Sequence, residues 1–183
     1  TIVFAEGDNA VVLEDEDLTD LSPLGLPNYR QATPDDLVVL PAASFIGTLV
    51  NNDPLLINGV SVPLTDQWVL TVTETAAVIN ATDSYNVTIN AIANSKGLAF
   101  VDLQAILEQA STTGIVFDEY TMDTSLVFGG LVSLDGVHLT ARGYALMANK
   151  FLEAIDVAYG SNFVAAGKVA KAEDYVVSYP EGL

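Results

Sequence analysis

The sequence of 183 residues predicts an α/β fold, because helical and strand-like patterns alternate along its second half. Thr71 and Glu74 have the spacing of a capping box, which predicts that a helix begins there. The apolar run Leu98–Val101 is typical of a buried strand. Apolar residues at helical spacing then predict a helix from Ala141–Tyr159, and Gly160 ends it.

The first third of the chain is predicted to contain short strands joined by long loops. Thr1–Phe4 and Ala10–Leu13 have the pattern of two strands of a β-hairpin, with a turn at Gly7-Asp8-Asn9. The stretch Leu21–Pro34 contains three prolines and is predicted to be a loop. Asp36–Leu40 is rich in β-branched residues, which predicts a buried strand.

The helix that follows the capping box is predicted to end at Lys96-Gly97. A short helix is predicted at Asp102–Gln109. One face of the first of these helices carries Val78, Tyr85, Ile89 and Ile92. The stripe of the last helix consists of Tyr144, Ala148, Phe151, Ile155 and Ala158. These patterns divide the chain into a loop-rich segment (1–64), an α/β portion (65–160) and a C-terminal tail (161–183).

The composition excludes several classes of function. Six basic residues against 24 acidic ones give a net charge of −18, so binding of DNA or RNA through a general basic field is excluded. Anionic membrane surfaces are disfavoured for the same reason, and no apolar run reaches the roughly 18 residues of a transmembrane helix. The absence of cysteine and the single histidine exclude iron–sulfur clusters, cysteine zinc sites and any site with two histidines. No metal or organic cofactor is implied.

An acidic run at Glu14–Asp17 has two interpretations. It could hold calcium, but it lacks the glycine and the spaced oxygen ligands of a known calcium loop. Blocks of like charge are usually solvated, so the sequence favours a solvated acidic edge over a metal site.

The residues that carry chemistry are concentrated in Asp135-Gly136-Val137-His138. Histidine is the side chain whose ordinary pKa suits a general base near neutral pH. Asp135 lies three residues earlier across a glycine-containing turn, so it can bond one imidazole nitrogen and leave the other free to accept a proton. The alternative interpretation is an ordinary histidine on a surface turn.

The block Val132–Tyr144 resembles the last motif of the SGNH/GDSL hydrolases, in which an Asp-x-x-His pair precedes the final helix. The run Gly97–Asp102 is similar to the strand that leads toward that motif in the family. The resemblance implies a partial three-layer α/β/α arrangement. It also implies that Asp135 orients His138 and that His138 activates a serine for attack on an acyl ester.

The serine of that family stands in a Gly-Asp-Ser motif, where this sequence has Gly7-Asp8-Asn9. An amide has no hydroxyl to deprotonate, so Asn9 is no nucleophile. The family's oxyanion asparagine is not found either, because Pro41-Ala42-Ala43-Ser44 follows the predicted strand that ends at Leu40. Ser44 is the weak remaining candidate for the nucleophile.

Two accounts of the missing serine stay open. In one, the chain is a complete SGNH domain that has lost its catalytic groups. In the other, which we favour, it is the C-terminal part of a longer bacterial lipase or esterase. The segments 10–21 and 39–48 resemble internal segments of such enzymes, so 1–64 would be an internal insertion. The alternative function is a non-catalytic interaction or binding domain.

This account carries two further expectations. A sheet that loses its neighbouring strands exposes Val38–Leu40 and Leu98–Val101, together with part of the stripe of the last helix. Such bare apolar edges predict a homo-oligomer, with a dimer as the simplest form. Relatives of this kind are often exported, which predicts a place in the cell envelope or outside the cell.

Overall fold

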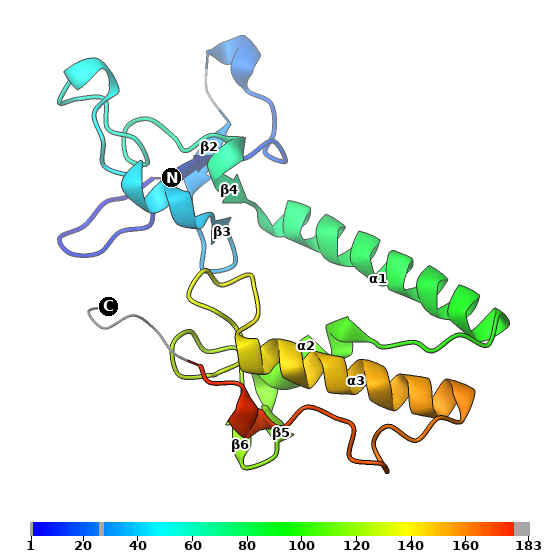
Figure 1. The fold of residues 1–183 in the computed structure, drawn as a ribbon. Coiled ribbons are helices and arrows are strands. Elements are labelled where there is room, and N and C mark those ends of the chain that lie inside the picture. The colour runs from blue at the N-terminus through cyan, green and yellow to red at the C-terminus, as the bar shows by residue number, and fades with distance from the viewer. Residues whose placement is uncertain (1, 26–27, 178–183) are drawn as a thin grey trace. The chain divides into compact units, whose positions relative to one another are not determined.

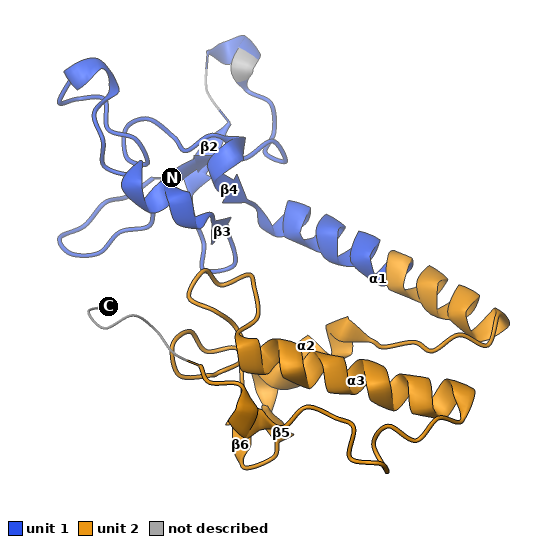
Figure 2. Ribbon diagram, viewed as in Figure 1, with its two compact units in different colours: residues 1–84 blue, residues 85–183 orange. Residues whose placement is uncertain are grey.

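The computed structural model describes residues 2–25 and 28–177 (Figure 1). The chain forms two compact units, Thr1–Ser84 and Tyr85–Leu183, whose boundary falls inside helix α1, Val72–Ser95 (Figure 2). The described residues contain three α-helices and three two-stranded antiparallel sheets. This mixture confirms an α/β fold in the broad sense. The division at residues 64 and 160 stays a prediction about sequence organisation.

Unit 1 (Thr1–Ser84) is built around two small antiparallel sheets. The first pairs β1 (Val12–Glu14) with β2 (Tyr29–Gln31), and the second pairs β3 (Leu37–Val38) with β4 (Val69–Leu70). The buried side chains of Leu13, Leu64 and Val69 form the core. Phe45 and Trp68 pack against this core as stacked rings whose centroids lie 4.6 Å apart. Short strands and a small core explain why most of this unit consists of turns and loops.

The predicted N-terminal hairpin between residues 1–4 and 10–13 is wrong. Residue 1 lies outside the described part of the chain, and residues 2–4 form no strand. The backbone N–H and C=O of Val3 bond instead with the side-chain amide of Gln31, at 2.9 and 3.0 Å. A side chain therefore takes the place of a strand partner, and β1 pairs with β2, inside the stretch that was predicted to be a loop.

The predicted buried strand at Asp36–Leu40 is also wrong in its burial. Only the two residues of β3 pair with another strand, and Leu37 and Leu40 are exposed. The buried member of the segment is Asp36, whose carboxylate has an ionic partner. Hydrophobicity alone therefore pointed to the wrong face of this segment.

An ionic network links the two sheets of unit 1. Nη1 and Nη2 of Arg30 donate to the Asp36 carboxylate at 2.6 and 2.8 Å, and Nε donates to Asp15 at 2.5 Å. The Arg30 guanidinium, helped by two donors of Thr33, holds the pKa of Asp36 well below its usual range, although burial acts in the opposite direction. Within the run Glu14–Asp17, Asp15 therefore turns inward, while its three neighbours are exposed as predicted.

Helix α1 begins at the predicted capping box. The N–H and hydroxyl of Thr71 donate to the Glu74 carboxylate at 2.7 and 2.8 Å, and the Glu74 N–H donates back to Thr71. Gly97 follows the helix with a φ of +62°, which a glycine adopts without strain. Only Ala93 of this helix is buried. The residues of the predicted apolar face, all exposed, are Val78, Tyr85, Ile89 and Ile92.

Unit 2 (Tyr85–Leu183) packs helices against a β-hairpin. Its further elements are α2 (Leu103–Thr112), β5 (Ile115–Phe117), β6 (Tyr120–Met122) and α3 (Ala141–Tyr159). The largest buried side chains of its core include Phe117, Met122, Leu131, Leu146 and Met147. Helix α3 has the predicted bounds, with Gly160 in the left-handed conformation at its end. No helix in the described ranges is both long enough and apolar enough to cross a membrane.

The face of α3 that packs on the core differs from the predicted stripe. Tyr144 and Phe151 are exposed, while Leu146 and Met147 are buried. The C-terminal segment contacts the buried face, because the side-chain amide of Asn149 bonds both the N–H and the C=O of Ala170 at 2.8 Å. The described part of the tail therefore packs on α3.

The predicted strand at Leu98–Val101 is not a strand in the structure. The segment joins α1 to α2, and among the described residues no strand pairs with it. A strand needs a neighbour for its backbone hydrogen bonds, and sequence alone cannot supply one.

Candidate active site

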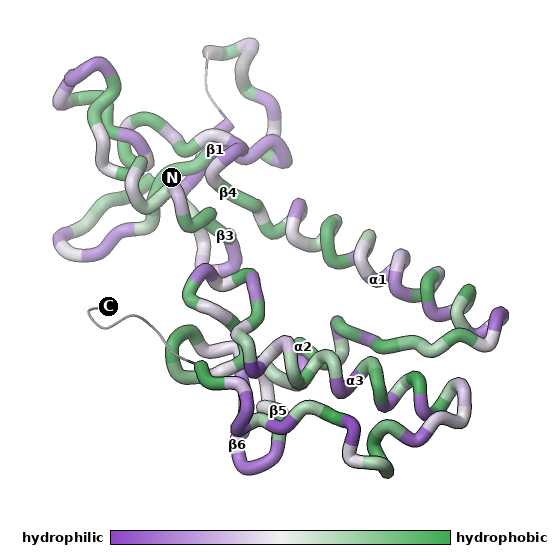
Figure 3. The backbone as a smooth tube through the Cα atoms, viewed as in Figure 1, coloured by the Kyte–Doolittle hydropathy of each residue, from purple (hydrophilic) through white to green (hydrophobic). Residues whose placement is uncertain are grey.

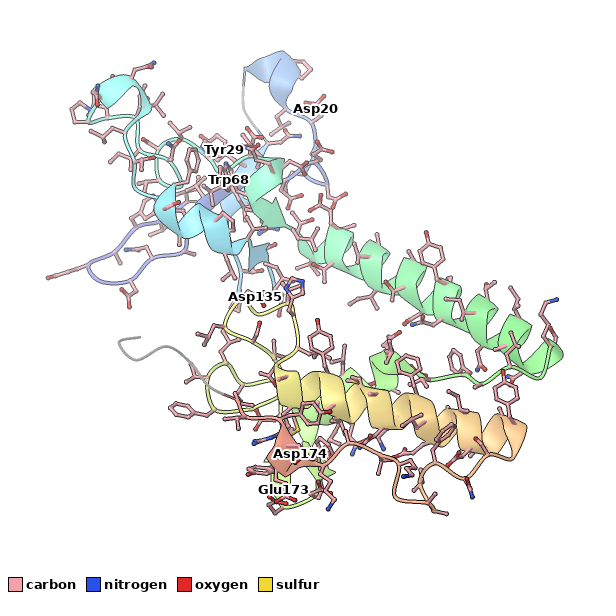
Figure 4. The ribbon with its side chains drawn as sticks, in the orientation of Figure 1. Asp20, Tyr29, Trp68, Asp135, Glu173 and Asp174 are labelled. Atoms are coloured by element: carbon pink, nitrogen blue, oxygen red, sulfur yellow. The ribbon has the colours of Figure 1, made fainter. Side chains whose placement is uncertain are left out.

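A short loop before α3 carries both residues that the sequence singles out, and Asp135 is labelled on it in Figure 4. Val132 and Leu139 form an antiparallel bridge at its base. Within the loop, the N–H of Ser133 donates to the carbonyl of His138 at 2.8 Å, and the N–H of Gly136 donates to the carbonyl of Ser133 at 3.0 Å. Gly136 has a φ of +72°, so a glycine suits the turn between the aspartate and the histidine.

The loop is fixed to the first turn of α3. The hydroxyl of Thr140 accepts the N–H of Gly143 at 2.9 Å and donates to the carbonyl of Gly130 at 2.6 Å. A Cβ atom at Gly143 would lie 2.4 Å from the carbonyl oxygen of Leu131, so only glycine permits this close approach. Because Leu131 belongs to the core, the loop is tied directly to the rigid part of unit 2.

The carboxylate of Asp135 divides its two oxygens between the loop and the imidazole ring. Oδ2 lies 2.7 Å from Nδ1 of His138, which confirms the prediction that these side chains face each other within hydrogen-bonding distance. Oδ1 accepts three hydrogen bonds, from the hydroxyl of Ser133 at 2.6 Å and from the N–H groups of Val137 and His138 at 2.9 Å. The loop therefore orients the carboxylate through bonds that do not involve the ring.

These donors also favour the ionised carboxylate, because they hold the pKa of Asp135 well below its usual range. The hydrogen bond from the Ser133 hydroxyl is the largest cause, followed by those from the Val137 N–H and from His138. An ionised acceptor at Nδ1 favours the tautomer with its proton on that nitrogen. Nε2 is then the nitrogen that can accept a proton.

Sequence reasoning missed Ser133. Its hydroxyl and both of its backbone groups bond to the Asp135–His138 turn, so it is the residue that closes the loop. The available signal was a serine two residues before an aspartate, since short polar side chains often bond to nearby groups of their own turn.

The imidazole is open to solvent. The side chains of His138 and Asp135 are 71% and 51% exposed. Among the described residues no protein group accepts or donates a hydrogen bond at Nε2. A hollow of about 460 Å³ lies beside the carboxylate. Its lining consists of Ser133, Leu134, Asp135, Thr140, Ala141, Val176 and Val177.

The other residues considered from sequence have structural partners within unit 1. The hydroxyl of Ser44 donates to the carbonyl of Pro41 at 2.9 Å. The side chain of Asn9 bonds the N–H and the carbonyl of Ala5, and so closes the predicted turn. In the described ranges, no three residues of the His, Cys, Asp and Glu types are grouped so that they could hold a metal ion.

The site is therefore an ionised carboxylate that orients one exposed imidazole on a rigid loop. Neither a known protein-family model, nor a curated protein sequence, nor a solved structure matches this chain.

Proposed function

We propose that this chain is the C-terminal part of a serine ester hydrolase related to the SGNH/GDSL lipases and esterases. In this proposal the chain supplies the base and the orienting acid, and a serine outside the chain supplies the nucleophile. The strands that carry this serine would complete a three-layer α/β/α arrangement. The observation that carries the proposal is the 2.7 Å bond from Asp135 to Nδ1 of His138 on a loop fixed to the core.

The reaction assigns one role to each side chain. Nε2 of His138 takes the proton of the serine hydroxyl while the serine oxygen attacks the acyl carbon of the ester. The imidazolium then returns this proton to the departing alcohol, which leaves an acyl-enzyme that water hydrolyses with the same base. Asp135 stabilises the imidazolium and keeps the ring in one tautomer. Groups outside the chain would hold the developing oxyanion.

A second candidate function is a non-catalytic binding domain on a related scaffold. It is favoured by one observation, the absence of a nucleophile at the exposed Nε2 within the described residues. A binding domain needs no particular tautomer of the imidazole, whereas a catalytic base does.

The single histidine makes the tautomer directly measurable. With ¹⁵N-labelled protein at a pH where the ring is neutral, long-range ¹H–¹⁵N correlation spectra should show a protonated Nδ1 and a bare Nε2. Asp135→Asn should redistribute the proton between the two nitrogens. Asp156→Asn should leave it in place, because Asp156 lies in the last turn of α3 and its carboxylate bonds only to the loop that follows. A ring in the Nε2–H tautomer would count against a catalytic role.

Ester hydrolysis tests the origin of the serine. The isolated chain should hydrolyse p-nitrophenyl acetate no faster than His138→Ala, and a fluorophosphonate probe should label no serine in it. Labelling of a serine together with loss of turnover in His138→Ala would show that the chain carries its own nucleophile. If the coding sequence before Thr1 contains a Gly-Asp-Ser or Gly-Asn-Ser block, the longer protein should lose about 10³-fold in kcat upon His138→Ala.

A further inference from the structure

Ser133 contacts the Asp135–His138 turn with its side chain and with its backbone. Its hydroxyl donates to Oδ1 of Asp135 at 2.6 Å, a length typical of a hydroxyl bound to an ionised carboxylate. Its N–H donates to the carbonyl of His138 at 2.8 Å, and its carbonyl accepts the N–H of Gly136 at 3.0 Å. The backbone bonds close the turn by themselves, so the hydroxyl acts on the carboxylate rather than on the path of the chain.

Oδ1 of Asp135 is held from both sides of the residue. The N–H groups of Val137 and His138, which follow it, donate to Oδ1 at 2.9 Å. Ser133, which precedes it, supplies the third donor. A carboxylate oxygen has about two lone-pair sites, so three donors occupy Oδ1 fully and leave Oδ2 for Nδ1 of His138. The hydroxyl of Ser133 therefore completes the set of bonds that directs Oδ2 to the imidazole.

Ser133 is the loop residue whose side chain suits this task. The tube before α3 alternates between hydrophobic and hydrophilic residues, and Leu134 and Val137 have no side-chain donor (Figure 3). The hydroxyl of Thr140 is already used between the loop and the first turn of α3. The carboxylate of Asp135 is half exposed, so water competes for it. A donor fixed on the same loop keeps the carboxylate in place against this competition.

A second serine–aspartate pair of unit 2 shows what such a hydroxyl does without an imidazole. The hydroxyl of Ser125 is the largest cause that holds the pKa of Asp123 below its usual range, as the hydroxyl of Ser133 is for Asp135. The N–H of Ser125 also donates to Asp123 at 2.7 Å. The single histidine of the chain is bound to Asp135, so the bond at Asp123 serves its own turn. This pair is therefore a matched control for a purely structural effect.

We propose that Ser133 is a positioning residue, whose hydroxyl holds the Asp135 carboxylate so that Oδ2 stays bound to Nδ1 of His138 and Nε2 stays free to accept a proton. The inference rests on the proposed function, because a catalytic base needs a fixed tautomer and a binding domain does not. The hydroxyl of Ser133 donates to Asp135, so the inference gives Ser133 no part as the nucleophile.

The tautomer of the ring tests this role. Ser133→Ala removes the hydroxyl and keeps both backbone bonds of the turn. In long-range ¹H–¹⁵N spectra of the neutral ring it should lower the ratio of Nδ1–H to Nε2–H about threefold, the effect of one modest hydrogen bond on an equilibrium. Ser133→Thr keeps the hydroxyl and should restore the wild-type ratio. Ser125→Ala, the matched control, should leave the ratio unchanged. An unchanged ratio in Ser133→Ala, or equal changes in both alanine variants, would overturn the proposal.

The carboxylate can be followed independently of the ring. In a titration of ¹³C-labelled carboxyl groups, Ser133→Ala should raise the pKa of Asp135 toward its usual range, because the ionised form loses a donor. His138 is the titratable side chain that contacts this carboxylate, and it is present in both proteins, so it does not account for a difference between them. Ser125→Ala should raise the pKa of Asp123 instead. An Asp135 titration that is unchanged in Ser133→Ala would show that the hydroxyl does not hold the carboxylate.

A double-mutant cycle separates this inference from the proposed function. In Asp135→Ala, the further change Ser133→Ala should have no effect on the ring, because the hydroxyl acts through the carboxylate. An effect as large as in the wild-type background would overturn the proposal. A wild-type ring with its proton on Nε2 would reject the proposed base and, with it, the role of Ser133. A ring with its proton on Nδ1 that is insensitive to Ser133→Ala would reject the role of Ser133 alone.

Discussion

The two units of this chain obtain their stability in different ways. Unit 1 contains 13 of the 24 acidic residues and only Arg30 of the six basic ones. Its apolar core is small, and an ionic network adds to the stability of the unit. Unit 2 has nine buried residues in one apolar cluster that includes parts of α2, α3 and the β5–β6 hairpin. The candidate site lies on unit 2, where a packed core can hold a loop in one geometry.

Asp36 in unit 1 and Asp135 in unit 2 show the same difference between the units. Both Asp36 and Asp135 have a pKa far below the usual range. Asp36 is buried, and all its partners serve to hold unit 1 together. Asp135 is half exposed and uses only one oxygen for the loop, so the other remains for an imidazole that faces solvent. A depressed pKa therefore marks a structural role in one unit and a candidate catalytic role in the other.

The largest effect is expected from a cavity in unit 2. Leu131→Ala removes a fully buried side chain beneath the candidate loop and should destabilise unit 2 by about 3 kcal/mol. The imidazole signals of His138 report on unit 2, and the fluorescence of Trp68, the one tryptophan, reports on unit 1. The His138 transition should move to lower urea concentration while the Trp68 transition stays in place. Phe128→Ala, at a side chain that is 93% exposed, is the control and should change neither.

Loss of the ionic network should have a comparable effect on unit 1. Arg30→Ala leaves the buried Asp36 carboxylate without its partner, which costs about 3 kcal/mol. Urea denaturation followed by Trp68 fluorescence should detect this loss, and Arg30→Lys should restore only part of it because lysine cannot form the bidentate pair. An unchanged Trp68 transition in Arg30→Ala would show that the stability of unit 1 does not depend on the ionic network.

A smaller effect is expected from acid. Because the folded-state pKa of Asp36 is depressed, its contribution is complete above the unfolded value of about 4 and decreases as the pH falls toward the folded value. The Trp68 transition should therefore weaken below about pH 4, and this dependence should flatten in Asp36→Asn. Asp35→Asn, at the exposed neighbouring residue, should keep the wild-type dependence. Identical acid profiles in both variants would contradict the role assigned to the network.

The smallest effect concerns the start of α1. Thr71→Ala removes the hydroxyl from the capping box and should cost about 1 kcal/mol. Thr71→Ser keeps the hydroxyl and should cost much less. Thermal unfolding followed by circular dichroism measures both variants, and equal transitions would show that the cap contributes nothing to stability.

The sequence by itself determined the features that depend on neighbouring residues. The capping box at Thr71 and the bond between Asp135 and His138 each join groups three residues apart. The bounds of α3 depend on the residues at its two ends. Local conformation and short-range hydrogen bonds decide such features, so their residue types and spacing are sufficient to predict them.

Tertiary structure alone decided which faces are buried and which strands have partners. Arg30 lies in a stretch predicted to be a loop, yet it neutralises Asp36 and Asp15. The tail bonds to Asn149, and Leu146 rather than Tyr144 faces the core. Leu98–Val101 has the composition of a strand but no partner in the described chain. Each outcome depends on contacts between distant residues, and hydrophobic spacing alone does not specify which distant group supplies the contact.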